Sequence, residues 1–327
     1  MLTLLEAYLK ENWRSFVESP AVLNGLGWLI QSRSRILAFA LPRNARWPVA
    51  VAKISRNEDT ARRTANEFDN LQAILKCLSS PWAETVPYPV ALEQIGQRTV
   101  AWERFVVGHP WTLSNVHFLE KSPVGPWSQV YRWLVNFQSQ CTYGTQVLDD
   151  RALETNLVGP VASLLEEAGF SPRVQQQARD VGRRLRGLTV PRVHRHGDLH
   201  PTNLLFLGEC LQGVTDWEMA CPDVWPFYDW FQFLFEYHLE LARKRTPSAE
   251  RAVILQSLVA VLFDCASPHE ETLRTWTIRF LANYGIPYEV TPLLWLHYAW
   301  EVYWPEDKEG FLKVVVPAVV QWAGWDA

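Results

Sequence analysis

The stretch Val193-His194-Arg195-His196-Gly197-Asp198-Leu199-His200-Pro201-Thr202-Asn203 holds the densest group of chemically active side chains in the sequence. It is followed by an apolar run, by a turn with Gly208-Glu209, and then by Val214-Thr215-Asp216-Trp217-Glu218. Residues 204–207 and 211–215 are typical of two short strands around that turn. We expect the resulting hairpin to bring Asp216 back towards Asn203.

An Asp, an Asn and a second Asp that converge in this way are what phosphoryl transfer from Mg-ATP requires. One carboxylate takes the proton of the acceptor hydroxyl and orients it. The amide oxygen and the second carboxylate are hard oxygen ligands, which suit magnesium. Because such transfer needs positioning and charge more than covalent chemistry, a few well-placed groups suffice.

These two segments resemble the motifs of the aminoglycoside phosphotransferase and choline kinase family. Residues 196–203 look like that family's HGDxHxxN catalytic loop, and Asp216-Trp217-Glu218 looks like its metal-binding element, 18 residues after Asp198. The resemblance implies that Asp198 is the catalytic base and that His196 belongs to the catalytic set by holding the loop. It also implies that Asn203 and Asp216 bind the metal and that Glu218 assists a second ion.

The same resemblance implies a lysine and a glutamate that clamp the nucleotide phosphates. Val49-Ala50-Val51-Ala52-Lys53-Ile54 is similar to the V-A-I-K strand of kinases and offers Lys53. Glu67, on the helix that follows, is the best match for its partner, with Glu58 and Asp69 as weaker candidates.

Two further segments complete the implied nucleotide site. Residues 102–108 resemble the hinge between kinase lobes, where backbone groups at Glu103 and Phe105 are the expected purine contacts. The loop Gln31-Ser32-Arg33-Ser34-Arg35 has no glycine, so Ser32 and Ser34 are the candidate phosphate donors. The implied cofactors are Mg²⁺ and ATP, with GTP as an alternative nucleotide.

The pattern of the whole chain agrees with a bilobal, protein-kinase-like α+β fold. The first third predicts short antiparallel strands at 27–32, 36–41, 49–54 and 99–107. Apolar steps of three and four residues predict an amphipathic helix over about 57–78. After Gly108 the pattern is mostly helical. We therefore expect a nucleotide-binding N-lobe at 1–107 and a larger, mostly helical C-lobe at 108–327 with the catalytic loop and the acceptor site.

Composition excludes several other classes. The 327 residues carry a formal net charge of −4, with a pI near 6.1, which does not favour a nucleic-acid partner. The longest charge-free apolar stretches are well short of the ~20 residues that span a bilayer. Five cysteines without a CxxC pair suggest reduced thiols, so we expect a cytoplasmic protein.

The partner is expected to be a small-molecule hydroxyl acceptor: first a sugar, aminosugar or aminoglycoside-like compound, second an amino alcohol such as choline. The 17 tryptophans include several in the C-terminal half that could stack on such molecules, although aromatic residues at helical spacing are more often core. The alternative from another class is a catalytically silent nucleotide-binding or scaffold protein. A protein kinase is disfavoured, since no long activation segment follows Asp216. The sequence does not define an oligomeric state.

Overall fold

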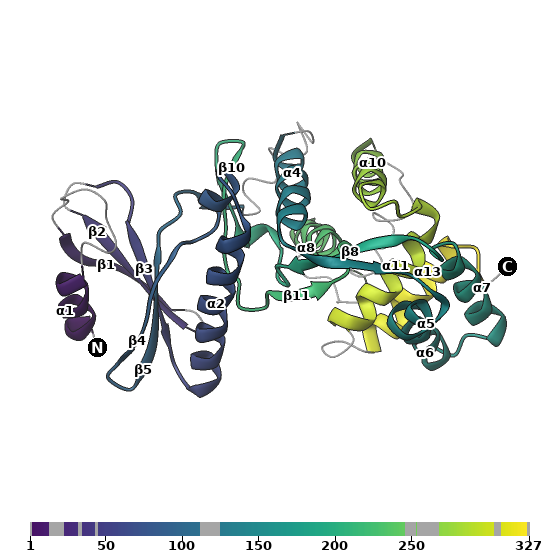
Figure 1. Ribbon diagram of the computed structural model, residues 1–327, viewed down its shortest axis with the longest axis horizontal. Helices are drawn as coiled ribbons and strands as arrows, with labels where there is room; N and C mark the ends of the chain where they lie inside the picture. The colour runs from purple at the N-terminus through teal and green to yellow at the C-terminus, as the bar shows by residue number, and fades with distance from the viewer. Residues whose placement is uncertain are drawn as a thin grey trace. The chain divides into compact units, whose positions relative to one another are not determined.

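The computed structural model describes residues 2–12, 23–31, 35–42, 45–111, 125–245, 253, 268–303 and 309–325. The chain divides into two compact units. Unit 1 comprises residues 1–111, 196–198 and 202–221, and unit 2 comprises residues 112–195, 199–201 and 222–327. The expected fold class, α+β with a small antiparallel sheet and a larger helical part, is confirmed (Figure 1).

Unit 1 contains a five-stranded antiparallel sheet in the order β1-β2-β3-β5-β4. Its strands are β1 (Leu23–Gln31), β2 (Arg35–Pro42), β3 (Ala50–Ser55), β4 (Pro89–Ile95) and β5 (Arg98–Arg104). The sequence analysis missed β4 and extended β5 three residues too far, since β5 ends at Arg104. Beyond that point the apolar Phe105-Val106-Val107 continues without strand pairing.

Two helices cover opposite faces of this sheet, as the alternation of strand side chains requires. Helix α1 (Leu2–Asn12) buries Leu5 and Leu9 against Ala38, Ala52 and other inward residues of the sheet. Helix α2 (Glu58–Cys77) packs on β3 and β5 from the other side (Figure 1). Lys53, next to Ala52 in β3, therefore points to the α2 face.

A second, three-stranded sheet in unit 1 includes the hairpin between residues 196–203 and residues 216–218. Its order is β10-β9-β6, with β6 (His109–Pro110), β9 (Leu204–Leu207) and β10 (Cys210–Val214), and the short helix η4 (Pro201–Asn203) precedes β9. Both pairings are antiparallel. The predicted hairpin is thus confirmed, and Thr215 N–H donates to the carbonyl of Asn203 at 2.9 Å.

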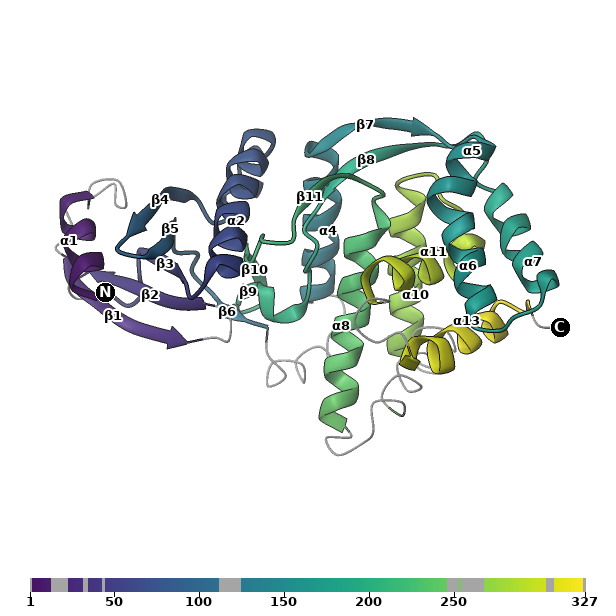
Figure 2. The ribbon, with the colours of Figure 1, turned by 90° about the horizontal axis from the view of Figure 1, so that it is seen from below.

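Unit 2 is mainly helical around one small sheet, in the order β11-β8-β7. The strands are β7 (Thr142–Val147), β8 (Thr189–Arg195) and β11 (Cys221–Val224), and β7 and β8 run side by side (Figure 2). The α-helices are α4 (Gly125–Gln140), α5 (Asp150–Leu153), α6 (Gly159–Glu167), α7 (Pro172–Arg183), α8 (Phe227–Arg245), α10 (Pro268–Ala282), α11 (Thr291–Tyr298) and α13 (Val316–Trp322). Three π-helical turns also occur in the described residues, η3 (Glu154–Val158), η6 (Ala299–Tyr303) and η7 (Phe311–Val315).

Aromatic side chains fill the core of unit 2. Trp127, Trp133 and Trp230 are almost completely buried, and Phe231 stacks on Trp295 with ring centroids 4.4 Å apart. Much of the tryptophan excess is therefore packing. None of the described helices is long and apolar enough to cross a membrane.

Candidate active site

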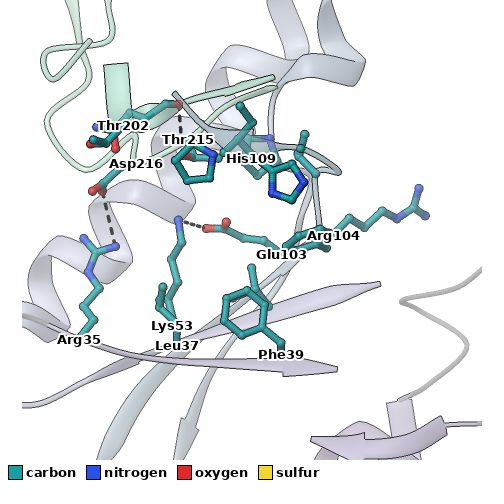
Figure 3. A pocket seen from close by; sticks show the side chains of 18 of the residues that line it. Arg35, Leu37, Phe39, Lys53, Glu103, Arg104, His109, Thr202, Thr215 and Asp216 are labelled. Atoms are coloured by element: carbon teal, nitrogen blue, oxygen red, sulfur yellow. Dashed lines mark hydrogen bonds and ion pairs between the residues drawn. The ribbon is translucent and has the colours of Figure 1, made fainter. Parts of the chain in front are cut away.

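A pocket of about 650 Å³ lies within unit 1. Alternate side chains of the large sheet form one wall: Arg35, Leu37 and Phe39 of β2, Val51 and Lys53 of β3, and Glu103 of β5. The hairpin region also lines the pocket with Asn203 and Leu205, and Figure 3 shows Thr202, Thr215 and Asp216 across from Lys53. Leu37 and Lys53 are register partners, which explains why both point into the same space.

Lys53 and Glu67 form a buried ion pair, as the sequence predicts. The same Glu67 oxygen accepts a hydrogen bond from the Trp217 N–H at 3.0 Å, so it also ties α2 to the Asp216-Trp217-Glu218 segment. Burial opposes the charge of Glu67, but Lys53 and Arg35 hold its pKa below the ordinary value. The carboxylate is fully buried and stays ionised beside the lysine.

Glu103 is a second partner of Lys53, with its Oε1 3.0 Å from Nζ (Figure 3). Burial raises the pKa of Glu103 to about 7, against the opposing effect of Lys53. Burial alone would lower the pKa of Lys53, but Glu103 and Glu67 together raise it above its ordinary value. The lysine is thus held fully charged at the floor of the pocket.

Arg35 extends this ionic cluster towards the metal-binding element. Its guanidinium pairs with Glu67 and Glu218, and one nitrogen lies 3.8 Å from Oδ1 of Asp216 (Figure 3). The Arg35 side chain is only 6% exposed, so its pairs with Glu67 and Glu218 are largely shielded from water, whereas the Asp216 side chain is 43% exposed. Arg35 therefore competes with any cation for the carboxylates that it contacts.

Asp216 has an unusual backbone conformation, with φ at +66° in the left-handed region. Non-glycine residues adopt this conformation rarely, and such residues gather at functional sites. The Oδ1 atom is buried and accepts no hydrogen bond among the described residues. Burial and the neighbouring Glu67 raise the pKa of Asp216, so the site would gain from an added positive charge.

Asp198 and Asn203 are joined directly. The Asn203 Nδ2 donates to the backbone carbonyl of Asp198 at 2.9 Å and to its Oδ2 at 3.0 Å. The amide nitrogen thereby orients the Asp198 carboxylate. Asn203 lines the pocket, and its amide oxygen is the atom that would be offered to a metal.

His196 holds the catalytic loop in place. Its Nδ1 accepts from the Asp198 N–H at 3.2 Å, and its Nε2 bonds to the Thr215 carbonyl at 3.0 Å. The ring is fully buried against Trp217, with centroids 4.4 Å apart. His196 therefore links the loop before Asp198 to the strand before Asp216.

Gly197 is required by a close backbone approach. A Cβ atom at this position would lie 2.2 Å from the carbonyl oxygen of Met219, and φ is +82°. Any other residue would push the loop away from the segment after Asp216, which explains the glycine of the HGD motif.

The remaining predicted site residues lie in different settings. Glu218 lines the pocket, but its carboxylate pairs with Arg35 and lies 3.7 Å from Arg63. Phe105 contributes its ring to the apolar wall, while its N–H is donated to the Val49 carbonyl at 2.9 Å. Ser32 and Ser34 lie outside the described residues.

The sequence analysis missed Arg35 and the side-chain role of Glu103. Arg35, Leu37 and Phe39 alternate along β2, but only the register of β2 with β3 puts Arg35 on the face of Lys53. It also missed Val106, which lines the pocket and whose N–H has no bonded partner among the described residues. The N–H groups of the two preceding residues are both engaged, since Arg104 donates to the Tyr88 carbonyl and Phe105 to the Val49 carbonyl.

Comparison with known proteins identifies a matching family and solved structures of similar fold. Residues 132–256 match the family described as the phosphotransferase enzyme family. A thermostable mutant of aminoglycoside phosphotransferase APH(4)-Ia, solved with ADP and hygromycin B, has a similar fold with a TM-score of 0.51 and 13% identity. That alignment covers 97% of this chain and 98% of the other.

Macrolide 2'-phosphotransferase MphH from Brachybacterium faecium gives a TM-score of 0.43 at 18% identity, over 97% of each chain. No curated protein matches the sequence. The family match and the shared protein-kinase-like fold confirm the resemblance to the aminoglycoside phosphotransferase family, and with it the prediction of an enzyme, a small-molecule phosphotransferase.

Proposed function

We propose that the protein transfers the terminal phosphoryl group of ATP, with Mg²⁺, to a hydroxyl of a small molecule. The observation that carries this proposal is one pocket of about 650 Å³ lined by Lys53, Asn203 and Asp216. A phosphate-binding lysine and two oxygen ligands meet there beside an apolar wall. That combination suits a nucleotide with its metal.

The nucleotide base fits the apolar side of the pocket. Leu37, Val51 and Leu205 supply flat apolar contacts, and the Val106 N–H is available to a purine nitrogen. Lys53 would contact the phosphates while Glu67 keeps it oriented. The neighbour of similar fold is a complex with ADP, which supports nucleotide use here.

The donor set fits magnesium. Asp216 and Asn203 offer a carboxylate and an amide oxygen, the hard ligands that this ion prefers. Oδ1 of Asp216 is buried and accepts no hydrogen bond among the described residues, and the pKa of Asp216 is raised by burial and by Glu67. A bound Mg²⁺ would stabilise the ionised form of this carboxylate and supply charge stabilisation to the transferring phosphoryl group.

Asp198 is assigned the role of catalytic base. Its carboxylate would accept the proton of the acceptor hydroxyl as that oxygen attacks the phosphorus atom. Asn203 orients Asp198 by donating to its Oδ2 and its backbone carbonyl, and His196 does so by accepting from its N–H. The acceptor we propose is a sugar, aminosugar or aminoglycoside-like molecule, and the neighbour's complex with hygromycin B supports this class.

The test is Mg²⁺-dependent transfer from ATP and GTP to pooled sugars, aminosugars, aminoglycosides, macrolides and amino alcohols, read by mass spectrometry. Asp198→Asn should lower the rate of product formation by about 10²–10⁴-fold, the usual contribution of a general base, while ATP binding persists. Glu209→Gln, in the exposed hairpin turn, is the matched control. A chain that binds no nucleotide under these conditions would contradict the proposal and favour a silent scaffold.

A further inference from the structure

Unit 2 contains a cavity of its own, of about 250 Å³. Segments far apart in the sequence form it, from η3, β8, the start of α8, α11 and η6. The lining side chains used below are Asn156, Arg192, Arg195, Tyr228, His297 and Glu301. None of them belongs to the nucleotide pocket of unit 1.

The two arginines of this cavity differ in how their charge is compensated. Arg192 donates from Nε to Oδ1 of Asp223 at 2.9 Å and from Nη1 to Gln146 at 3.1 Å. Arg195 has no carboxylate within 4.0 Å in the part of the chain that is described, and its Nε is buried without a hydrogen bond. The guanidinium carbon of Arg195 lies over the ring of Tyr228, 5.4 Å from the ring centroid. A half-buried guanidinium without a counter-charge is costly, so an anion would stabilise it.

The wall opposite Arg195 offers hydrogen-bond acceptors. Tyr228 and His297 are bonded through Oη and Nδ1 at 3.0 Å, and His297 is also bonded to the backbone of Asn156. Burial lowers the pKa of His297 to about 4, so this ring is neutral and adds no positive charge. When the ring donates its other N–H to Asn156, Tyr228 donates to Nδ1. The phenol oxygen and the exposed Glu301 carboxylate then accept from a ligand's hydroxyl groups.

The backbone around the cavity has features that are typical of functional sites. Two of the three π-helical turns in the described residues, η3 and η6, contribute Asn156 and Glu301 to its lining. Such turns occur frequently at functional sites. Asp223, which holds Arg192, has φ at +63°, in the left-handed region. These observations are independent of the charge argument.

We propose that this cavity binds a compact hydroxylated molecule through an anionic oxygen group, a carboxylate or a phosphate, on Arg195. The volume is smaller than the 300–1,000 Å³ typical of pockets for drug-sized ligands, which favours a single small ring or chain. A polycation is disfavoured by the two arginines. Arg195 stands three residues before Asp198 in the sequence, so the ligand is either the phosphoryl acceptor itself or a separate anion that binds beside the start of the catalytic loop.

Calorimetric titration of the full chain tests this site with four probes: gluconate, glucose 6-phosphate, inorganic phosphate and uncharged glucose. The anionic probes should bind and glucose should bind at least tenfold more weakly. Arg195→Met should weaken binding of the anionic probes tenfold or more, whereas Arg186→Met, a highly exposed arginine on another segment, should not change it. Lys53→Met should leave binding unchanged, which separates this site from the nucleotide pocket.

A second variant keeps the proposal testable if Arg195→Met does not fold. Glu301→Gln removes an exposed negative charge from the cavity and should strengthen binding of the anionic probes several-fold. The proposal is overturned if none of the anions binds at 10 mM, if glucose binds as well as gluconate, or if the Arg195 and Glu301 variants bind like the original chain.

Phosphoryl transfer from ATP then separates the two sources of the anion. A bound probe that gains a phosphoryl group is an acceptor, and a bound probe that is recovered unchanged is a separate ligand. Either result supports the site, because binding is measured without ATP. Failure of phosphoryl transfer to any acceptor would count against the proposed function and would leave the binding result standing.

Discussion

The interiors of the two units bury polar groups in opposite ways. Unit 1 buries charges, and Lys53, Glu67, Arg35 and Glu103 compensate one another around the nucleotide pocket. The buried polar side chains of unit 2 are mostly uncharged, and the buried His194 and His297 bond to the hydroxyls of the exposed Tyr143 and the buried Tyr228. Buried charges are thus concentrated around the pocket of unit 1, whereas uncharged polar groups predominate in the interior of unit 2.

The two kinds of interior should differ in how much stability a substitution costs. A buried ionic cluster is tolerable only while it is complete, because loss of one member leaves an uncompensated charge. An aromatic core loses contacts in proportion to what is removed. Substitutions of equal size should therefore cost more in unit 1, whereas the response of unit 2 to pH should come from its buried neutral histidines.

The largest effect is expected for Glu67→Gln. The change removes the shared partner of Lys53 and Arg35 and leaves two buried cations with less compensation. We expect the free energy of unfolding of unit 1 to fall by about 3–5 kcal/mol. Hydrogen exchange read by mass spectrometry would localise the loss to peptides of unit 1.

Glu58→Gln, at the exposed start of the same helix, is the control and should change exchange little. If Glu67→Gln lowers the free energy of unfolding by less than about 1 kcal/mol, the ion pairs do not stabilise unit 1. Substitutions would then not cost more in unit 1 than in unit 2.

Part of this cluster could be predicted from the sequence. The pair of Lys53 and Glu67 was predicted through the resemblance of the V-A-V-A-K strand to the V-A-I-K strand of kinases, with Glu67 on the next helix as the best match for the partner of Lys53. The hairpin that returns Asp216 to Asn203 was predictable because its two strands flank a short turn. Strand β5 was placed, but its end depended on pairing with β3 and β4.

Arg35 and Glu103 could not be assigned from sequence alone. Arg35 meets Glu67 only because β2 pairs with β3 in a register that sets Leu37 opposite Lys53. Glu103 reaches Lys53 across the neighbouring strand, from a position that the sequence analysis assigned to backbone contacts with a purine. A shift of one residue in either register would turn these side chains to the other face.

The next effect is the pH dependence of unit 2. Burial lowers the pKa of His194 and of His297 to about 4, from 6.5 in an unfolded chain. Between these values the unfolded chain binds a proton that the folded unit does not, so stability falls as the pH drops from about 6.5 to about 4. The loss should be about 3 kcal/mol for each histidine.

Denaturant unfolding at several pH values would measure this slope, with hydrogen exchange to assign it to unit 2. His297→Gln keeps a neutral polar side chain and should reduce the slope by about half, whatever its effect at pH 7. An unchanged slope in this variant would show that His297 titrates normally and is less well buried than the structure has it.

A smaller loss is expected for Phe231→Leu in the aromatic core. Phe231 is fully buried and its ring lies parallel to that of Trp295, at an interplanar angle of 3°. Leucine keeps most of the apolar volume but loses the stacked pair, so we expect a cost of about 1–1.5 kcal/mol without dependence on pH. Thermal unfolding at pH 5 and pH 8 would measure it, and a cost that differs between the two would contradict the view that this core is uncharged.

The smallest effect concerns the start of α2, the helix that carries Glu67. Asn57 caps it, since its Oδ1 accepts from the Thr60 N–H at 2.9 Å while the Thr60 hydroxyl accepts from the Asn57 N–H at 3.0 Å. Asn57→Ala should cost about 1 kcal/mol, whereas Asn57→Gly should cost only a few tenths, because glycine is tolerated at this position. Both variants keep every charge of the cluster, so hydrogen exchange should report fraying of the first turn and unchanged protection around Glu67. If protection from hydrogen exchange falls as much around Glu67 as at Thr60, helix α2 opens as a single unit. The ionic cluster then does not stabilise the central turns of the helix when the cap is lost.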